Sequence, residues 1–138
     1  MLKKLMIATL AAAAPALMLA PSMASAQDIE AGKKVFRKCK ACHAVGEGAK
    51  NKVGPQLNGV VGRKSAAIEG YKYSKAMAEI GLTWDEATLD KYLEDPKGLV
   101  KGTKMIYRGL KKEKDRKNII AYLATFDAEG KQAAAATQ

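Results

Sequence analysis

Cys39-Lys40-Ala41-Cys42-His43 is the stretch from which this 138-residue chain is best interpreted. The Cys-x-x-Cys-His spacing is the attachment signature of c-type haem. The two thiols add covalently to the haem vinyl groups, and the adjacent imidazole reaches the iron as an axial ligand. The sequence therefore predicts one covalently bound haem, with Cys39 and Cys42 as its anchors and His43 as an iron ligand.

Two other chemistries use paired cysteines, and the composition weighs against both. The chain has two cysteines and one histidine, all within this pentapeptide, which is too few for a four-ligand zinc site. A thioredoxin-like redox pair remains as an alternative, but it requires a βαβ context, and no strand pattern follows the motif. It would also leave His43 and a later methionine, Met105, without a role.

The first 26 residues have the features of an export signal. Lys3 and Lys4 precede an apolar run over 5–20, and Ala24-Ser25-Ala26 fits a signal-peptidase site. A retained membrane anchor is the alternative, although the Ala-rich run is short and interrupted by proline. We expect a cleaved signal peptide at 1–26, a periplasmic domain at 27–130 and a flexible Ala-rich tail at 131–138.

The chain is strongly basic, with a net charge of +10. Without Lys3 and Lys4, 22 basic and 14 acidic side chains remain, a net charge of +8. Such a surface attracts acidic partners over long distances, although it can also serve solubility alone. Nucleic acid is another common partner of basic proteins, but an exported chain with few aromatic residues and no binding motif argues against it.

Apolar periodicity and capping signals predict an all-α fold of helices joined by Gly-rich loops. The segment 45–62 is glycine-rich and is expected to be loop. Thr83-Trp84-Asp85-Glu86 has the form of a capping box. Gly32 lies inside a predicted helix, where glycine costs stability, and this favours close approach by a second helix. The expected helices are 28–40, 74–80, 83–94, a short one beginning at Asp95-Pro96, and 112–126.

A six-coordinate iron needs a ligand opposite His43. Beyond the signal, the chain contains two methionines, Met77 and Met105. Met77 lies within a predicted helix, where methionine is usually a core residue, whereas Met105 ends the loop sequence Gly102-Thr103-Lys104-Met105. This favours Met105. His/Met ligation raises the reduction potential and closes both axial positions, which indicates electron transfer rather than catalysis at the metal.

Several further segments match a known family in order and spacing over about residues 28–126. They are Gly32-Lys33-Lys34-Val35-Phe36, Cys39 to His43, Val53-Gly54-Pro55-Gln56-Leu57-Asn58-Gly59, Gly62-Arg63, Gly70-Tyr71-Lys72-Tyr73-Ser74, Leu82-Thr83-Trp84, Tyr92-Leu93-Glu94-Asp95-Pro96, Gly102-Thr103-Lys104-Met105 and Ile120-Ala121-Tyr122-Leu123. With these segments the chain resembles class I cytochrome c, in particular the short bacterial carriers close to the mitochondrial type. The resemblance implies helices and loops wrapped around one haem, and an electron carrier that is not an enzyme.

The resemblance also implies roles for individual residues. Pro55 would accept a hydrogen bond from the His43 ring and so orient it. Tyr92 would lie within hydrogen-bond reach of the Met105 sulfur, and Thr103 would donate to one haem propionate. The inner propionates, which need donors when buried, would be surrounded by Arg63, Tyr73, Ser74 and Trp84. Plain core packing is the alternative for Tyr73 and Trp84. Gly32, Phe36 and Tyr122 would form the crossing of the first and last helices.

Two positions depart from the family pattern. Lys101 stands where the family usually has proline before Gly-Thr-Lys-Met, and proline restricts alternative loop conformations. We therefore expect a more mobile loop and a Met105 that is easier to displace, for instance by Lys104 or another lysine at high pH. Met77 stands where the family commonly has asparagine, so the polar network near Tyr92 is expected to differ.

For partners, the resemblance implies acidic redox proteins. The expected function is a soluble monomer that shuttles electrons between a membrane cytochrome bc complex and a terminal oxidase or photosynthetic reaction centre. Contact with the membrane surface would be peripheral and transient. An acceptor for a periplasmic dehydrogenase, and a haem sensor or enzyme with a labile Met105, are the alternatives. The lysines expected around the haem edge are Lys38, Lys40, Lys52, Lys97, Lys101, Lys104 and Lys111.

Overall fold

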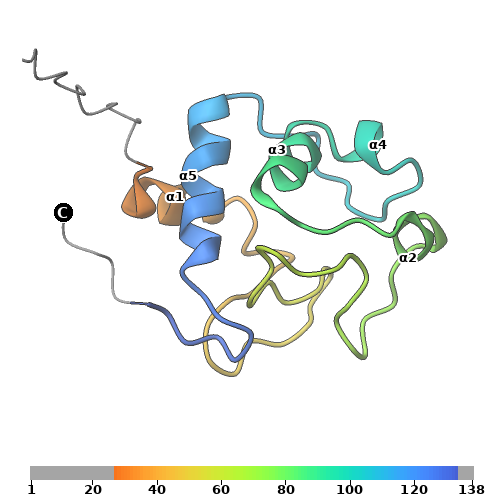
Figure 1. Ribbon diagram of the computed structural model, residues 1–138, viewed down its shortest axis with the longest axis horizontal. Helices are drawn as coiled ribbons and strands as arrows, with labels where there is room; N and C mark the ends of the chain where they lie inside the picture. Colours follow the sequence, from red (N-terminus) through yellow and green to blue (C-terminus); the bar gives the residue numbers. More distant parts are fainter. Residues whose placement is uncertain (1–26, 134–138) are drawn as a thin grey trace, which may run out of the picture.

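The computed structural model describes residues 27–133, so the expected signal peptide and residues 134–138 lie outside the described part. Within this part, helices and long loops line a cavity, and Figure 1 shows how these elements are arranged. Apart from two isolated β-bridges, residues 27–133 contain no strand, which confirms the all-α prediction. The helices are α1 (Ile29–Phe36), α2 (Lys75–Ile80), α3 (Glu86–Glu94), α4 (Pro96–Leu99) and α5 (Glu113–Ala124).

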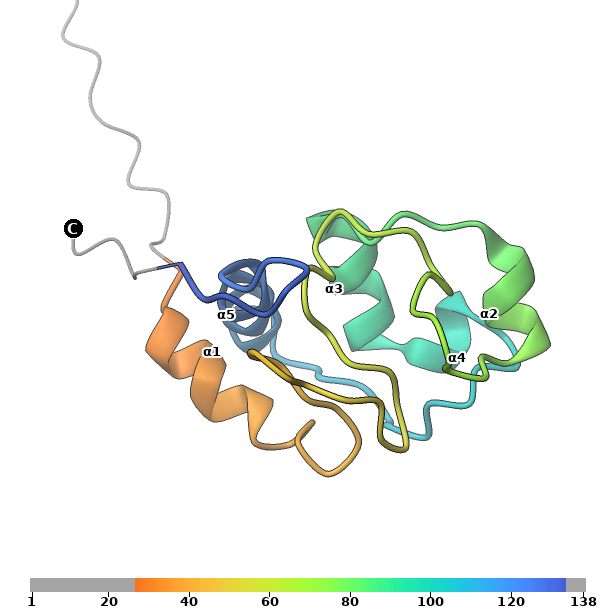
Figure 2. The ribbon, with the colours of Figure 1, turned by 90° about the horizontal axis from the view of Figure 1, so that it is seen from below.

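The first and last helices cross at close range (Figure 2). At the crossing, a Cβ atom added to Gly32 would overlap the carbonyl oxygen of Asn118 and lie 2.8 Å from Cβ of Tyr122. The rings of Phe36 and Tyr122 pack beside this point, with their centroids 5.6 Å apart. The prediction that Gly32 marks a helix contact is therefore confirmed.

Helix α1 ends at Phe36, so the predicted extension to Lys40 is wrong. The backbone tightens into turns in which Cys39 N donates to Phe36 O at 2.8 Å and His43 N donates to Cys39 O at 2.9 Å. These bonds compete with continuation of the helix. They also gather both cysteines and the histidine within a short stretch of chain at the end of α1.

The start of α3 also differs from the prediction. Its N-cap is Asp85, whose Oδ1 accepts a hydrogen bond from Thr88 N at 2.7 Å. Thr83, expected to open the capping box, instead forms a β-bridge with Lys64, and Trp84 N donates to Arg63 O at 2.8 Å. The pairing with 62–64 holds residues 83–84 extended, and therefore the helix begins later.

Much of the hydrophobic core lies between α3 and α5, and it is continuous with the wall of this cavity. Ile119 and Val100 are 1% and 0% exposed. Leu89 and Leu93 of α3 and Leu123 of α5 contribute both to the core and to the lining of the cavity described below. The two helices thus pack against each other and present an apolar wall at the same time.

Arg116 secures the segment that follows Met105. Its side chain is 6% exposed, and Nε donates to Asp90 Oδ1 of α3 at 2.8 Å. Its Nη1 donates to the carbonyls of Leu110 and Lys111, both at 3.0 Å. One side chain of α5 therefore holds the end of this loop against α3.

A small hairpin follows α5. Asp127 N donates to Lys131 O at 3.0 Å, and Ala133 N donates to Thr125 O at 2.8 Å. Regular hydrogen bonding therefore continues beyond Lys131, where we expected the flexible tail to begin. No helix within residues 27–133 has the length and apolar character needed to cross a membrane.

Candidate functional site

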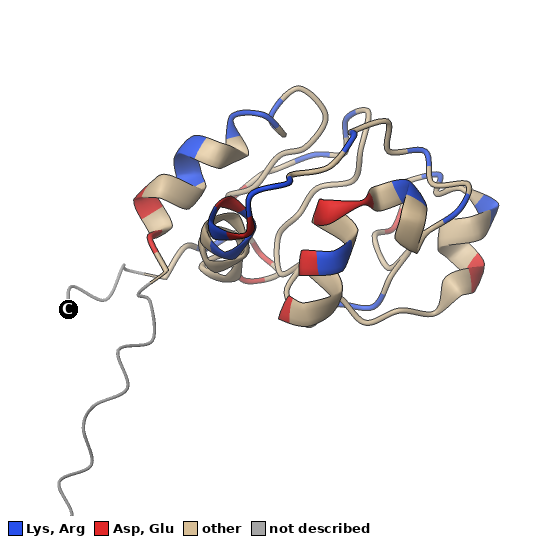
Figure 3. Cartoon of the chain, turned by 90° about the horizontal axis from the view of Figure 1, so that it is seen from above, with Lys and Arg blue, Asp and Glu red and all other residues tan. Residues whose placement is uncertain are grey.

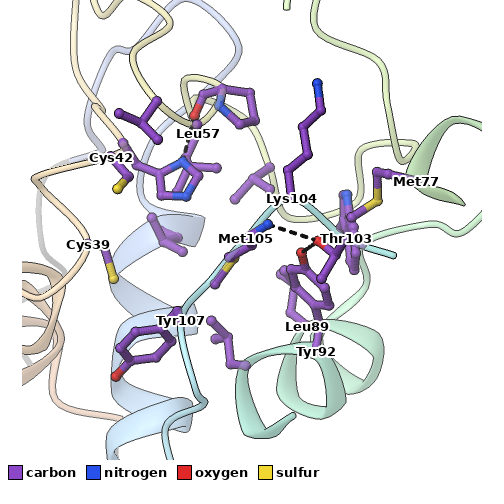
Figure 4. Close-up of a pocket in the computed structure, with 18 of the residues that line it drawn as sticks. Cys39, Cys42, Leu57, Met77, Leu89, Tyr92, Thr103, Lys104, Met105 and Tyr107 are labelled. Carbon is purple, nitrogen blue, oxygen red and sulfur yellow. Dashed lines mark hydrogen bonds between the residues drawn. The ribbon is translucent and has the colours of Figure 1, made fainter. Parts of the chain in front are cut away.

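A cavity of about 260 Å³ opens between α3, α5 and the long loops. Figure 4 shows Cys39 and Cys42 on one side of it and Met105 and Thr103 on the other. Every residue expected to serve the cofactor lines this one space: Cys39, Cys42, His43, Pro55, Arg63, Tyr73, Ser74, Trp84, Tyr92, Thr103 and Met105. Most of the remaining lining is apolar.

His43 is held in one orientation by its neighbours. Its Nδ1 lies 2.7 Å from the carbonyl oxygen of Pro55. A carbonyl can only accept, so Nδ1 carries the proton and Nε2 keeps its lone pair. Gly54 packs flat against the ring, where an added Cβ would lie 2.9 Å from Nε2. Burial lowers the pKa of His43, so the imidazole is neutral at pH 7, as metal binding requires.

The two cysteines are partly buried free thiols. Burial raises the pKa of the Cys39 thiol to about 11, and the neighbouring Cys42 adds to this effect. Thiol–disulfide exchange needs a thiolate, and redox Cys-x-x-Cys motifs lower a cysteine pKa rather than raise it. This electrostatic environment therefore weighs against the thioredoxin-like alternative.

Met105 is half-buried at the other side of the cavity. Its backbone N–H donates to Thr103 Oγ1 at 3.3 Å, and the same oxygen lies 2.8 Å from the Tyr92 hydroxyl. Tyr92 is thus paired with Thr103, whereas the resemblance led us to expect the Met105 sulfur as its partner. Trp84 packs against Tyr92, with ring centroids 4.9 Å apart.

Arg63 offers a buried donor to the cavity. Its Nη1 donates to the carbonyl of Asn58 at 2.9 Å, while Nε is buried and has no partner within the described chain. Burial also lowers the pKa of Arg63. A buried guanidinium N–H without a partner fits a carboxylate acceptor, such as a haem propionate.

Tyr73 and Ser74 each hold a hydroxyl group at the cavity. The Tyr73 hydroxyl accepts from Ile68 N at 3.2 Å, and Ser74 Oγ accepts from Met77 N at 3.1 Å as the N-cap of α2. Both hydroxyls act as acceptors in these bonds and keep a proton that can be donated to a propionate.

These groups together fit haem c. The cavity combines two thiols, a neutral imidazole nitrogen, a thioether, apolar walls and an unpaired buried guanidinium N–H. Within residues 27–133, no three His, Cys, Asp or Glu side chains are grouped so that they could hold a metal ion by themselves.

Sequence reasoning missed several residues at this site. Tyr107 lines the cavity near Cys39, and its only signal was an aromatic residue two positions after Met105. Val53 and Ile106 also line the cavity and are 75% and 83% exposed. Isolated apolar residues in loop sequences give no indication of exposure, because burial depends on which segments come to lie beside them.

Comparison with known proteins agrees with this geometry. The family model "Cytochrome c" matches residues 29–127. Cytochrome c-554 of Methylosinus trichosporium is 50% identical over 131 residues, covering 95% of this chain and 99% of the relative. Cytochrome c2 of Rhodoblastus acidophilus is 56% identical over 105 residues, covering 76% of this chain and 98% of the relative.

A solved structure is similar as well. Cytochrome cH from Methylobacterium extorquens superposes with a TM-score of 0.67 and 48% sequence identity. The match covers 71% of this chain and 98% of the other. Sequence and structure therefore lead to the same family.

Proposed function

We propose that this chain, which belongs to the cytochrome c family, is a one-electron carrier with His43 and Met105 as its axial ligands. Haem c, attached through Cys39 and Cys42, supplies the one-electron chemistry. The observation that carries the proposal is the lone pair of His43 Nε2 in the same apolar cavity as the Met105 thioether. If His43 and Met105 both held the haem iron, no open site would remain there for a substrate.

The other lining residues would prepare the cavity for electron transfer. Pro55 and Gly54 hold the imidazole in place, which limits rearrangement when the charge at the site changes. Arg63, with Tyr73 and Ser74, would pair with propionate oxygens, since these three residues provide donors at one part of the wall. The apolar wall from α3 and α5 excludes water and so favours a high reduction potential.

The proposed pair of iron ligands, His43 and Met105, is tested by removing the Met105 thioether. We expect Met105→Ala to abolish the far-red iron–sulfur band and to create rapid carbon monoxide binding. Met77→Leu is the matched control, because Met77 also lines the cavity but has no proposed iron bond, and it should keep the band. If only the Met77 variant lost the band, Met77 rather than Met105 would be the iron ligand, which would contradict the proposal.

The surface around the cavity supports docking of an acidic redox partner. The seven lysines expected there are all exposed, and Lys38 and Lys104 line the cavity itself. Acidic residues gather instead on α3 (Figure 3). Exposed Val53 and Ile106 lie within the basic region, where desolvated apolar contacts would complement the steering charges.

The side chains of three of these lysines donate hydrogen bonds to backbone carbonyls. Lys104 Nζ donates to Lys72 O at 2.6 Å, and Lys111 Nζ donates to Glu94 O at 2.7 Å. Lys52 Nζ donates to Lys40 O. Charges held in this way lose less side-chain entropy when a partner binds.

In the cell, we propose a periplasmic location after cleavage at Ala26. The carrier would accept electrons from a membrane cytochrome bc complex and deliver them to an oxidase or photosynthetic reaction centre. The similarity to cytochromes c2 supports this assignment. A periplasmic dehydrogenase as electron donor is the alternative, since it would use the same surface.

Docking is tested by the ionic-strength dependence of electron transfer to isolated membranes. We expect the bimolecular rate to fall steeply as salt shortens the screening length from about 30 Å at 0.01 M to about 10 Å at 0.1 M. Lys38→Gln should lower the low-salt rate severalfold, whereas Lys114→Gln, at an exposed position of α5 that does not line the cavity, should not. A rate independent of salt would contradict charge-steered docking.

A further inference from the structure

Asn58 is a buried polar residue to which the haem-binding proposal above gives no role. It is 5% exposed although it lies in a loop. Its Oδ1 accepts from Gly46 N at 2.8 Å, and its Nδ2 donates to Gly46 O at 2.8 Å. A side-chain amide that pairs with both backbone groups of one residue replaces a backbone rung.

This rung completes a ladder that encloses His43. The segments 42–46 and 54–58 run side by side, with the histidine in the first and Pro55 in the second. Without Asn58, the ladder would end at Leu57 and leave both polar groups of Gly46 without these partners. Its other rungs are Gly54 N to Cys42 O at 2.8 Å, His43 Nδ1 to Pro55 O at 2.7 Å, and Leu57 N to Ala44 O at 2.9 Å.

The backbone of Asn58 serves a second functional residue. Its carbonyl accepts from Arg63 Nη1 at 2.9 Å, and its N–H is occupied by Gln56 Oε1 at 2.7 Å. Arg63 is the residue whose buried Nε has no partner within residues 27–133. Through its side chain and its backbone, Asn58 therefore connects the His43 ladder with the cavity guanidinium.

The C-terminal turn 127–130 covers this connection. Gly59 N donates to Phe126 O at 3.2 Å, which seats the turn on the loop. Gly130 is buried at φ +84°, where an added Cβ would overlap Gly46 O and lie 2.6 Å from Asn58 Nδ2. The absence of a side chain at Gly130 allows the turn to pack directly on the Asn58–Gly46 pair.

We propose that Asn58 is a positioning residue that sets the His43 ring and the Arg63 guanidinium relative to each other, with turn 127–130 as its cover. The inference rests on the proposed function, because its consequence is measured at the haem. A fixed positive charge beside the cavity disfavours the oxidised, more positive form. The hydrogen bond to His43 tunes the same equilibrium through the ligand.

The reduction potential of the purified holoprotein is the direct readout. Asn58→Ala removes both bonds to Gly46 and leaves the carbonyl that holds Arg63 on a loosened loop. We expect the potential to fall, so that the ratio of reduced to oxidised protein at fixed applied potential drops about tenfold, equivalent to 59 mV for one electron. If Asn58→Ala lowered the free energy of unfolding but left the reduction potential unchanged, Asn58 would have a structural role only, and the proposal would be wrong.

A pair of glycine variants provides the test if Asn58→Ala does not fold. Gly130→Ala pushes a methyl group against the Asn58–Gly46 pair. Gly48→Ala is the matched control, since Gly48 also has a positive φ, +73°, but nothing lies within 4 Å of its added Cβ. The potential of Gly130→Ala should be lower than that of Gly48→Ala, and equal potentials would contradict the inference.

The wild-type spectrum distinguishes a failure of the proposed iron ligands from a failure of the role proposed for Asn58. A wild-type protein without the iron–sulfur band would contradict the proposed axial pair, whatever the variants do. A normal wild-type spectrum with equal potentials in the glycine pair would contradict the role of Asn58 alone.

Discussion

His43 is prepared for metal binding by its neighbours. The Pro55 carbonyl fixes the proton on Nδ1, and burial keeps the ring neutral. Gly54 provides the flat surface against which the ring lies. A side chain at position 54 would displace the imidazole, so the residues that flank the motif in space matter as much as the motif itself.

Residue chemistry explains which site residues could be predicted. Cys39, Cys42, His43 and Met105 were predicted by spacing and by elimination, because few residue types bind haem iron, and the structure places all four at one cavity. The pairing of Tyr92 with Thr103 could not be found in this way, since it depends on side-chain orientation. Asn58 in a Gly-rich segment looks like an ordinary turn residue, and only the packing of the C-terminal turn reveals its burial.

Lys101 provides a prediction about the stability of the Met105 loop. No hydrogen bond from the Lys101 amide occurs within the described residues, so proline can replace it without losing one. Lys101→Pro should stabilise the closed loop by about 0.4–1 kcal/mol through restriction of alternative conformations. We expect imidazole to bind the oxidised iron about two- to fivefold more weakly, as measured by optical titration. Equal or tighter imidazole binding would show that Lys101 does not loosen the loop.

Tyr122 provides a pH prediction. Burial raises the pKa of Tyr122 above its usual value, so ionisation above pH of about 10 occurs in the unfolded chain first. The free energy of unfolding should therefore fall with rising pH in that range, by up to about 1.4 kcal/mol per pH unit for this group.

Tyr122→Phe removes this contribution. Chemical unfolding at pH 7 and pH 11 should give a smaller loss of stability for the variant than for the wild type. The two proteins share every other ionisable group, so the difference between them isolates Tyr122. An equal loss in both proteins would contradict a raised pKa.

At the level of secondary structure elements, the close contact between α1 and α5 depends on the absence of a side chain at Gly32. Gly32→Ala would make a methyl group overlap the backbone of Asn118, and this overlap can be relieved only if the backbone of α1 or α5 moves. We expect a loss of about 2–3 kcal/mol in the free energy of unfolding, measured by denaturant titration of the holoprotein. Lys33→Ala, at the neighbouring exposed position, is the control and should change stability by less than about 0.5 kcal/mol. Comparable losses in the two variants would rule out a close helix contact at Gly32.

Helix positions were predicted better than helix ends. Apolar periodicity located the helices that form the core and the cavity wall, because burial of one face imposes that pattern. The predicted end of α1 and the predicted start of α3 were wrong because other hydrogen bonds form there. These are the turns at 37–43 and the bridge between Lys64 and Thr83. Such competition depends on segments that are distant in the sequence.

At the scale of the whole molecule, core and cofactor site form one packing unit. Leu89, Leu93 and Leu123 belong to both the hydrophobic core and the cavity wall. A haem in this position would bury apolar surface on the inner faces of α3 and α5, so cofactor attachment and folding stability should be coupled. The long loops are compatible with a stable protein for the same reason.

Charge is also organised at this scale. The exposed Lys38 and Lys104 line the cavity, whereas acidic residues recur along α3 (Figure 3). The composition alone indicated a basic protein, but the separation of charges depends on the fold. An uneven charge distribution of this kind would orient the molecule toward the acidic partner that we propose.

We propose that residues of this chain, His43 and Met105, hold both sides of the iron of a covalently bound haem. The most direct test is the optical spectrum of the purified mature protein, oxidised and reduced, extended to the far-red region. We expect a low-spin c-type reduced spectrum together with a weak iron–sulfur band in the oxidised protein. A c-type spectrum without that band, combined with rapid carbon monoxide binding, would contradict this proposal and favour a haem sensor or enzyme.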